Sequence, residues 1–260
     1  MAENQWASAI SSVVPNEIRV RGYRLDELMG CVSFGEAVYL VLRGELPGAA
    51  VGRLVEAILV ASIDHGVTPP STLSARNAAS TGAPLNAAIA AGTLAVNRHH
   101  GGAVESCMRL LARGASRLRA GETAAAAAAA LIAEEKAAGR RLPGFGHRIH
   151  TDDPRSGRLI ALANDAQAAG PHVTLAEAIA ARLAASGKAL PLNVDGAIAA
   201  VLADLGFAPE LANGFFILAR TAGWMAHVSE ELGREKPMRH IDQNACTYDG
   251  PTPRALPEDP

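Results

Sequence analysis

The chain has 260 residues, of which 49% are hydrophobic and 19% charged, and its formal net charge is −2 at pH 7. This length allows one large domain or two small ones, with a substantial buried core. The charge balance excludes a general affinity for nucleic acid, so any anion site must be built from a few placed cations.

Three cysteines, Cys31, Cys107 and Cys246, lie far apart in the sequence. Their odd number and wide spacing argue against a disulfide framework or a zinc site, so we expect no metal. The first residues carry no positive segment leading into an apolar core, and no stretch reaches the roughly 18 uncharged apolar residues of a membrane span. We therefore expect a cytoplasmic protein without a membrane or nucleic-acid partner.

Helices dominate the elements predicted along the chain, because good helix formers are abundant and period-two runs of Val, Ile or Thr are hard to find. The first predicted helix covers 49–64 and ends near His65 and Gly66, where Pro69 and Pro70 block its continuation. Further helices are predicted over residues 84–96, 103–118, 122–138, 174–186, 194–205 and 209–232.

Local signals mark the ends of two of these helices. Thr174 and Glu177 have the spacing of a capping box, which predicts that a helix opens at Thr174. Pro209 suits the first turn of the last helix, which is long enough that we expect a break near Gly214 or Gly223. No internal repeat and no Gly/Ser-rich linker divides the chain.

The most informative of the loops between these helices is the segment 143–155. Gly144 and Gly146 allow the backbone to approach a ligand closely or to adopt a positive φ. His147 can exchange a proton near neutral pH, and Arg155 offers a planar fork for a carboxylate. The alternative is a surface turn with solvated charges, which the clustering of glycine, histidine and arginine disfavours.

Asp195 follows Pro191 and precedes a predicted helix. From position alone, capping of that helix is the favoured interpretation of this carboxylate. Apolar neighbours such as Val194 and Ile198 would make it a useful base instead.

Two more segments carry candidate functional groups. His99 and His100 are adjacent and point in different directions, so one is predicted to donate a hydrogen bond and the other to face solvent. Arg220 and His227 share one face of the last helix. A buried Arg220 requires an anion, either a protein carboxylate or a substrate carboxylate, and His227 is typical of a satisfied core histidine.

Together these groups suit a di- or tricarboxylate ligand and acid–base chemistry beside a carbonyl. The sequence lacks the Gly-x-Gly-x-x-Gly of a dinucleotide fold, a P-loop and the Gly-x-Ser-x-Gly of a nucleophile elbow.

The chain resembles the citrate synthase superfamily over nearly its whole length. Within it, the chain is most similar to the short citryl-CoA lyases and to the C-terminal module of ATP citrate lyase. The matching pieces, specific in their joint order, are Pro-Asn-Glu-Ile-Arg-Val-Arg-Gly at 15–22, Ser-Phe-Gly-Glu-Ala-Val-Tyr-Leu at 33–40, His65 with Ser-Thr-Gly-Ala at 80–83, His-Gly-Gly-Ala at 100–103, Pro-Gly-Phe-Gly-His at 143–147, Asp-Pro-Arg at 153–155, Asn-Val-Asp-Gly at 193–196 and Ala-Arg-Thr-Ala-Gly-Trp at 219–224.

The resemblance implies an all-α, two-domain homodimer, with a large domain (1–102 and 201–260) and an inserted small domain (103–200). It also implies catalytic roles for three residues. His100 matches the histidine that stabilises the enolate of acetyl-CoA, Asp195 the carboxylate that moves the acetyl-methyl proton, and His147 the histidine on the oxaloacetate carbonyl.

Substrate-binding residues follow from the same resemblance. His65, Arg155 and Arg220 match groups that bind oxaloacetate, and the backbone of Gly144, Phe145 and Gly146 matches the part that meets coenzyme A. The implied activity is cleavage of citryl-CoA to acetyl-CoA and oxaloacetate. The alternatives are citrate synthesis from the same two compounds, another acyl-CoA condensation, and a non-catalytic subunit that binds CoA or a carboxylate.

One departure from the family lies near the C-terminus. Citrate synthases carry an Arg-Pro dipeptide there, which supplies a third arginine from the partner subunit, whereas this chain has Lys236 and Pro237. Arg239 is therefore the expected substitute as a carboxylate or phosphate partner.

Overall fold

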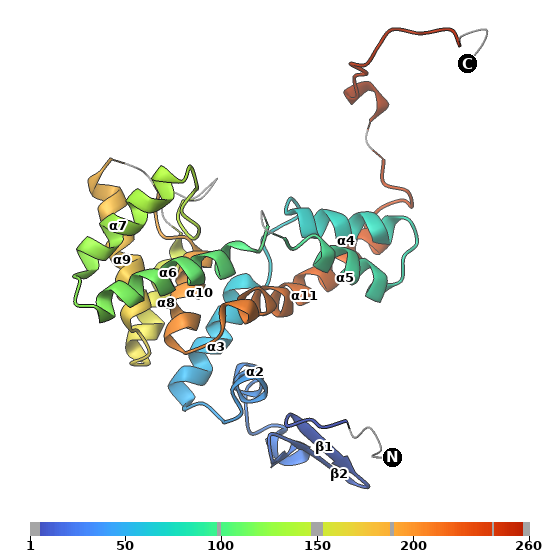
Figure 1. The fold of residues 1–260 in the computed structure, drawn as a ribbon. Coiled ribbons are helices and arrows are strands. Elements are labelled where there is room, and N and C mark those ends of the chain that lie inside the picture. The colour runs from blue at the N-terminus through green and yellow to red at the C-terminus, as the bar shows by residue number, and fades with distance from the viewer. Residues whose placement is uncertain (1–5, 98–99, 147–152, 188–189, 241, 257–260) are drawn as a thin grey trace, which may run out of the picture.

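The computed structural model describes residues 6–97, 100–146, 153–187, 190–240 and 242–256. The predicted helical fold is confirmed, with a small antiparallel sheet added at the N-terminal end (Figure 1). The strands are β1 (Ser11–Val14), β2 (Glu17–Val20) and β3 (Tyr23–Arg24). The helices are α1 (Leu25–Leu28), α2 (Phe34–Arg43), α3 (Ala49–Ser62), α4 (Pro70–Ser80), α5 (Leu85–Leu94), α6 (Ala103–Arg119), α7 (Ala124–Ala137), α8 (Pro154–Asp165), α9 (Pro171–Ala185), α10 (Val194–Asp204), α11 (Pro209–Arg234) and the 3-10 helix η1 (Gln243–Ala245).

The sheet, the helices α1, α2, α4 and α8, and the 3-10 helix η1 are additions to the predicted elements. Strands β1 and β2 pair through the two-residue turn Pro15–Asn16, in which Asn16 has φ +64°, as the second central residue of a type II turn does. Helix α2 opens with a true capping box between Ser33 and Glu36. Helices α4 and α8 both begin with a proline in the first turn. Thus Pro70, expected only to block a helix, also starts the next one.

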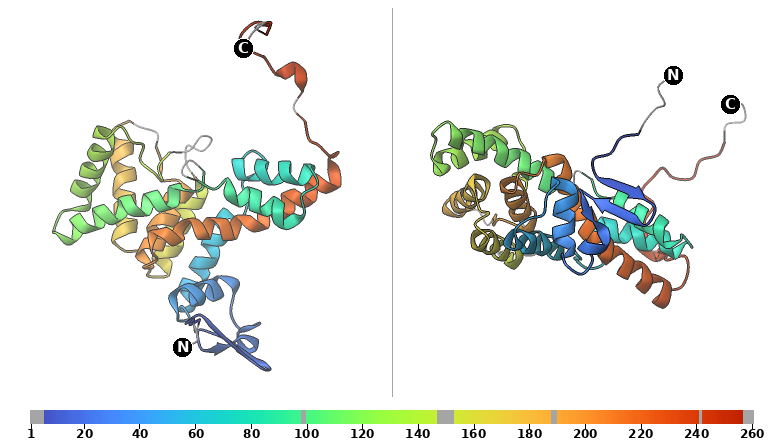
Figure 2. Two further views of the ribbon diagram at one scale, coloured as in Figure 1. Left: turned by 45° about the vertical axis from the view of Figure 1, so that its right-hand side comes forward. Right: turned by 90° about the horizontal axis from the view of Figure 1, so that it is seen from below.

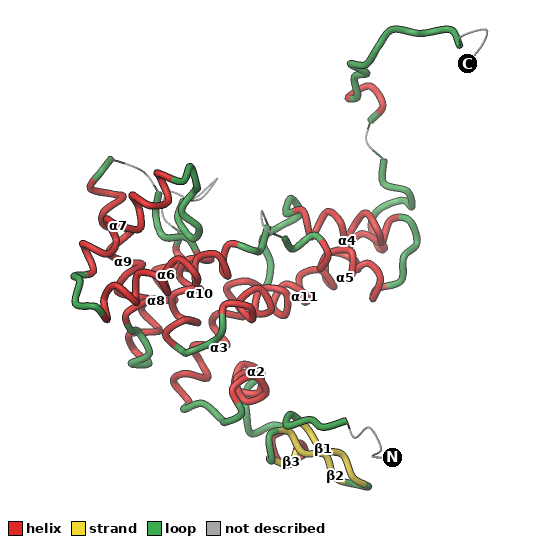
Figure 3. Tube along the Cα trace, in the orientation of Figure 1, coloured by secondary structure: helices red, strands yellow, loops and turns green. Residues whose placement is uncertain are grey.

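The helices form two groups joined by α11 (Figures 1 and 2). Helices α6–α10 gather on one side, while α4 and α5 pack along the C-terminal half of α11 on the other. The sheet and the segment after α11 both project from the helical body (Figure 3). None of the helices in the described ranges is long and apolar enough to cross a membrane.

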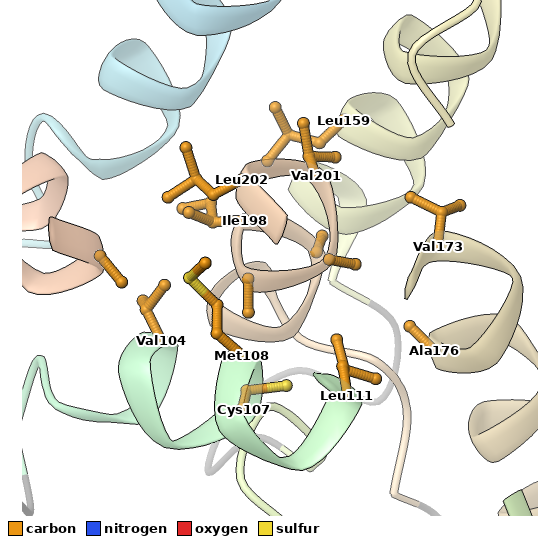
Figure 4. Packing of buried hydrophobic residues seen from close by; sticks show 14 of the residues in the cluster. Val104, Cys107, Met108, Leu111, Leu159, Val173, Ala176, Ile198, Val201 and Leu202 are labelled. Carbon is orange, nitrogen blue, oxygen red and sulfur yellow. The ribbon is translucent and has the colours of Figure 1, made fainter. Parts of the chain in front are cut away.

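Helix α10 is the centre of the larger group, and its residues from Gly196 to Leu202 are all buried. A helix that is apolar on every side must be surrounded by other elements. Figure 4 shows Ile198, Val201 and Leu202 of this helix between Met108 of α6 and Leu159 of α8. Helix α10 is therefore held on several sides.

A smaller cluster holds the second group together. Ala75 and Ala79 of α4 and Ala88 of α5 pack on Trp224 and Val228 of α11, all of them buried. These small side chains let the three helices approach closely, which fixes α4 and α5 against α11.

Two expectations about helix ends are wrong. Helix α9 begins at Pro171 with Gly170 as its N-cap, and the Thr174 hydroxyl donates to the Gly170 carbonyl 3.0 Å away instead of capping. Helix α11 runs without interruption from Pro209 to Arg234, so the expected break at Gly214 or Gly223 is absent. Packing of Gly223 against a neighbouring loop, described below, explains that glycine in another way.

The carboxylate of Asp204, at the end of α10, supplies the cap that α9 lacks. It accepts hydrogen bonds from the backbone N–H groups of Gly170, His172 and Val173 at 2.7–3.1 Å, and from the His172 ring at 2.7 Å. Burial opposes ionisation here, but these hydrogen bonds outweigh it, and the pKa of Asp204 is lowered. The start of α9 is thereby tied to the end of α10.

Replacing Asp204 with asparagine is expected to lower the free energy of unfolding by about 2–3 kcal/mol at pH 7, because hydrogen bonds to a buried charge are lost. Since the folded pKa is lowered, the carboxylate stabilises the fold above its unfolded pKa of about 3.9, and this contribution disappears as pH falls through the folded value. Denaturant unfolding of both proteins at pH 7 and pH 3 checks this. An equal difference at the two pH values would contradict it.

Candidate active site

A cavity of about 390 Å³ lies where the two helical groups meet. Its wall comes from the end of α3, the loop that follows it and the start of α4, from residues before and at the start of α6, from the starts of α8 and α10, and from one face of α11. The predicted site residues that line it are His65, His100, Gly146, Arg155, Asp195 and Arg220.

The other predicted residues lie elsewhere. His147 is outside the described residues. Gly144 and Phe145 do not line this cavity. Arg239 pairs with Glu231 through two hydrogen bonds, of 2.7 and 2.6 Å, and does not line the cavity of its own chain.

Asp195 sits in the first turn of α10, beside the N-cap. The capping role belongs to Asn193, whose side-chain oxygen accepts from the Gly196 N–H at 3.1 Å. No side chain or backbone N–H in the described ranges hydrogen-bonds to the Asp195 carboxylate. Burial raises its pKa, and the charges of Arg155 and Arg220 only partly oppose this. Asp195 can therefore hold and release a proton nearer to neutral pH than an ordinary aspartate.

Arg155 is fixed by its neighbour Asp153, the N-cap of α8. Its Nε and Nη2 atoms each lie 3.0 Å from a carboxylate oxygen of Asp153. The same carboxylate accepts the Val194 N–H at 3.1 Å, which ties α8 to the start of α10. Burial opposes the charge of Asp153, but these contacts outweigh it and its pKa is lowered. A rigid guanidinium therefore faces the cavity.

Arg220 is only 3% exposed. Its Nε donates to the Ser62 carbonyl at 2.8 Å, and its guanidinium carbon lies 4.7 Å from the centre of the Phe216 ring. The described residues place no carboxylate within ion-pair distance of Arg220. Burial lowers its pKa, although an arginine stays charged at neutral pH. A buried cation of this kind favours the second predicted partner, a ligand carboxylate.

His100 is the described member of the histidine pair, since His99 lies outside the described residues. Its Nε2 is 2.7 Å from the hydroxyl of Ser71, a buried residue in the first turn of α4. The ring also meets the Phe216 ring edge-on at 5.9 Å. Burial, and to a smaller extent Arg220, lowers the pKa of His100, so the imidazole is neutral at physiological pH.

The glycines of the segment 143–146 make a close backbone contact with the start of α10. Gly144 has φ +83°, and a Cβ added there would lie 2.7 Å from Gly196 Cα and 2.6 Å from Cys107 Sγ. The Gly144 carbonyl accepts the Asn193 N–H at 3.0 Å, and the Asn193 side chain donates to the Gly146 carbonyl at 2.7 Å. Residues 144–146, which precede His147, and the start of α10, which carries Asp195, are thus joined into one backbone unit.

A second pocket, of about 510 Å³, adjoins this unit and shares Gly146 with the first. Phe145 and Leu190 form part of an apolar wall, and Lys136, Arg140 and Arg141 supply positive charge. Arg140 is engaged by Glu135, whose pKa it lowers, together with Arg113, to about 2. In the described part of the chain Lys136 and Arg141 form no ion pair.

Sequence reasoning missed Ser71 and the role of Asp153. Ser71 follows two prolines, and a proline in the first helical turn could have shown that the serine begins a helix. Asp153 stands directly before Pro154 in the position of an N-cap, a signal that was readable from the sequence. Its use as a clamp for Arg155 depends on local geometry. Among the described residues no group of three or more His, Cys, Asp or Glu is placed to hold a metal ion.

Comparison with known proteins identifies relatives over most of the chain. The family model described as "Citrate synthase, C-terminal domain" matches residues 48–240. The citrate synthase of Haloferax volcanii is 30% identical over 205 residues, covering 76% of this chain and 52% of that protein. The chain thus spans about half the length of the curated relatives it matches.

Solved structures are similar as well. The citryl-CoA lyase of Hydrogenobacter thermophilus is 42% identical with a TM-score of 0.87, and the match covers 97% of both chains. The ATP citrate lyase of Methanothrix soehngenii, solved with citrate and coenzyme A, is 22% identical with a TM-score of 0.82. That match covers 97% of this chain and 43% of the other, and at this identity it shows the fold alone.

Proposed function

The chain belongs to the citrate synthase family, and on this premise we propose that it is a citryl-CoA lyase, which releases acetyl-CoA and oxaloacetate. The observation that carries the proposal is the convergence of a neutral imidazole (His100), a carboxyl group with a raised pKa (Asp195) and two guanidinium groups (Arg155 and Arg220) on one cavity. Similarity to a citryl-CoA lyase over 97% of both chains supports it.

The two arginines suit the carboxylates of the oxaloacetate part of the substrate. Arg155 is held by Asp153 and Arg220 by Ser62, so both forks are oriented before a ligand arrives. His65 lines the same wall and is proposed to bind the same end of the substrate. Fixing the carboxylates orients the bond that breaks.

Cleavage then needs one base, one hydrogen-bond donor and one acid. His147 is proposed to take the proton of the citryl hydroxyl as that oxygen becomes the carbonyl of oxaloacetate. The carbon–carbon bond breaks, and its electron pair moves into the thioester to give the acetyl-CoA enolate, whose oxygen accepts a hydrogen bond from His100. Asp195, protonated, then gives its proton to the enolate carbon, which becomes the methyl group.

Ser71 is expected to set the tautomer of His100. If the Ser71 hydroxyl donates to Nε2, the ring proton stays on Nδ1, where it can reach the enolate oxygen. Replacing Ser71 with alanine is therefore expected to lower kcat about tenfold while KM changes little, because the loss falls on a charge that develops during the reaction. Steady-state kinetics with citryl-CoA measures the split. Loss confined to KM would contradict this role.

The second pocket is the proposed place for coenzyme A. It adjoins Gly146, and Lys136 and Arg141 offer cations for phosphates while Phe145 and Leu190 offer apolar surface. Coenzyme A would thus enter as the thioester of the substrate, with its phosphates in one pocket and its acyl group in the other.

We propose that residues 103–200 form a small domain on a large domain of residues 1–102 and 201–260. We also propose a homodimer, because α4, α5 and α11 carry exposed apolar side chains, among them Leu73, Leu94 and Leu232. Arg239 lies away from the cavity of its own chain, so a substrate-binding role for it requires a second copy. Light scattering of the purified protein gives the oligomeric state.

The test of the proposed function is product analysis in both directions. Citryl-CoA should yield oxaloacetate, detected through malate dehydrogenase, together with acetyl-CoA. Citrate synthase is the second candidate, favoured by the 30% identity to a citrate synthase. It predicts free citrate and coenzyme A from acetyl-CoA and oxaloacetate. Absence of turnover in either direction would refute both.

A further inference from the structure

One face of α11 holds the loop that carries His65, and three residues of that face take part. Arg220 donates to the Ser62 carbonyl at 2.8 Å. Gly223 lies so close that an added Cβ would be 2.4 Å from the Ile63 carbonyl oxygen. His227 places its Nε2 3.0 Å from Oδ1 of Asp64. These positions recur at helical spacing, so the loop runs along the helix face.

The two oxygens of the Asp64 carboxylate have different partners. Oδ1 faces His227, while Oδ2 accepts the Gly66 N–H at 2.9 Å. Gly66 has φ +79°, a conformation that closes the turn tightly. His65 stands between these two residues, so the carboxylate holds the backbone around the histidine. Burial opposes the charge of Asp64, but the backbone N–H groups and His227 outweigh it and the pKa of Asp64 is lowered.

His227 is itself oriented by charged neighbours. With its ring proton on Nε2, His227 donates to Asp64, and its Nδ1, 3.5 Å from Nη1 of Arg76 and 3.9 Å from Oε2 of Glu230, can accept from the arginine. Arg76 is fixed at 2.7 Å by the buried carboxylate of Glu231 and at 3.1 Å by Glu230. The His227 side chain is 12% exposed. Charged side chains therefore contact both ring nitrogens of His227, Asp64 on one side and Arg76 on the other.

We propose that His227 is a positioning residue, which acts through Asp64 to hold the Asp64–Gly66 turn so that His65 faces the oxaloacetate end of the substrate. The inference rests on the proposed function and extends it to a residue that does not line the cavity. The proposed coenzyme A pocket is built from other elements, so His227 is not expected to act on it. Loss of His227 should therefore weaken binding of oxaloacetate and leave binding of coenzyme A unchanged.

Three substitutions test this. His227→Gln keeps an amide N–H near the place of Nε2, His227→Asn is too short to reach Asp64, and His227→Leu removes the donor. Calorimetry with oxaloacetate should show a dissociation constant about tenfold higher for the leucine and asparagine variants, as expected for one hydrogen bond to a charge. The glutamine variant should stay within about threefold of the wild type, by the same scale. Ser229→Ala, an exposed position on the same helix, is the matched control.

Each outcome has a definite meaning. If the leucine and asparagine variants bind oxaloacetate like the wild type, the proposal is refuted. It is refuted too if oxaloacetate and coenzyme A binding weaken together with a fall in Tm, or if a folded glutamine variant fails to restore binding. If the leucine variant does not fold, the comparison of asparagine with glutamine decides. If the wild type binds oxaloacetate but neither cleaves citryl-CoA nor condenses acetyl-CoA with oxaloacetate, only the proposed function is refuted. A wild type that binds no oxaloacetate would refute both.

Discussion

Replacing Asp195 with asparagine is expected to lower the rate of citryl-CoA cleavage by about 10²–10⁴-fold, the usual contribution of a placed proton donor. The amide has nearly the same shape but cannot give up a proton to the enolate carbon. The coupled oxaloacetate assay measures this loss directly. The fold should not suffer, because no hydrogen bond from the described residues depends on the Asp195 carboxylate and its burial disfavours the charge.

The pH dependence supplies a second check on Asp195. Its pKa is raised, and cleavage requires the protonated form, so the cleavage rate should fall as pH rises through that pKa. Condensation requires the ionised form, so its rate should rise as pH rises through the same pKa. Near-normal activity in the asparagine variant, or a cleavage profile unchanged by the substitution, would show that another group moves the proton.

Replacing Gly144 with alanine is expected to lower the free energy of unfolding by about 3 kcal/mol or more, and to abolish most activity in the protein that still folds. At φ +83° a side chain strains the backbone, and the new methyl group would meet Gly196 Cα and Cys107 Sγ at 2.6–2.7 Å. Gly196 cannot yield without moving the first turn of α10, and Cys107 is fully buried in α6. Chemical denaturation and the cleavage assay, measured on the same preparation, test both parts.

Gly157 provides the control, because a Cβ added there meets nothing within 4 Å. It lies within α8, where alanine is favoured over glycine by about 1 kcal/mol, so Gly157→Ala should be neutral or slightly stabilising. If both alanine variants behaved alike, the close approach of Gly144 to α10 would not matter for this protein.

Much of the fold was predictable because helical periodicity and glycine or proline boundaries are local signals. The start of α9 was not, because the group that caps it is Asp204, more than 30 residues away in the sequence. The sequence around Thr174 has the pattern of a capping box, but the hydrogen bonds to Asp204 start the helix three residues earlier, at Pro171. The short strands were not predicted either. All four residues of β1 are exposed, so its sequence shows little of the alternation between apolar and polar side chains that marks a strand.

For the site, residue type alone left Asp195 as a cap and His99 and His100 equivalent. The resemblance to a family assigned roles to Asp195 and His100. The structure then showed which residues lie beside each of them. Asn193 two positions earlier serves as the cap, and Ser71 from a different helix meets His100. The role of Arg239 stays a prediction, because within its own chain the guanidinium is engaged by Glu231.

The contact of Gly144 with Gly196 also bears on how the substrate range of this protein could be redesigned. The backbone of Gly144 and that of Gly196 in the first turn of α10 are in direct contact, so any larger residue at either position would displace the reactive carboxylate of Asp195. Thr68 and Ala103 line the cavity without taking part in that contact. Variant libraries aimed at longer acyl groups should therefore begin at these two positions and leave both glycines unchanged.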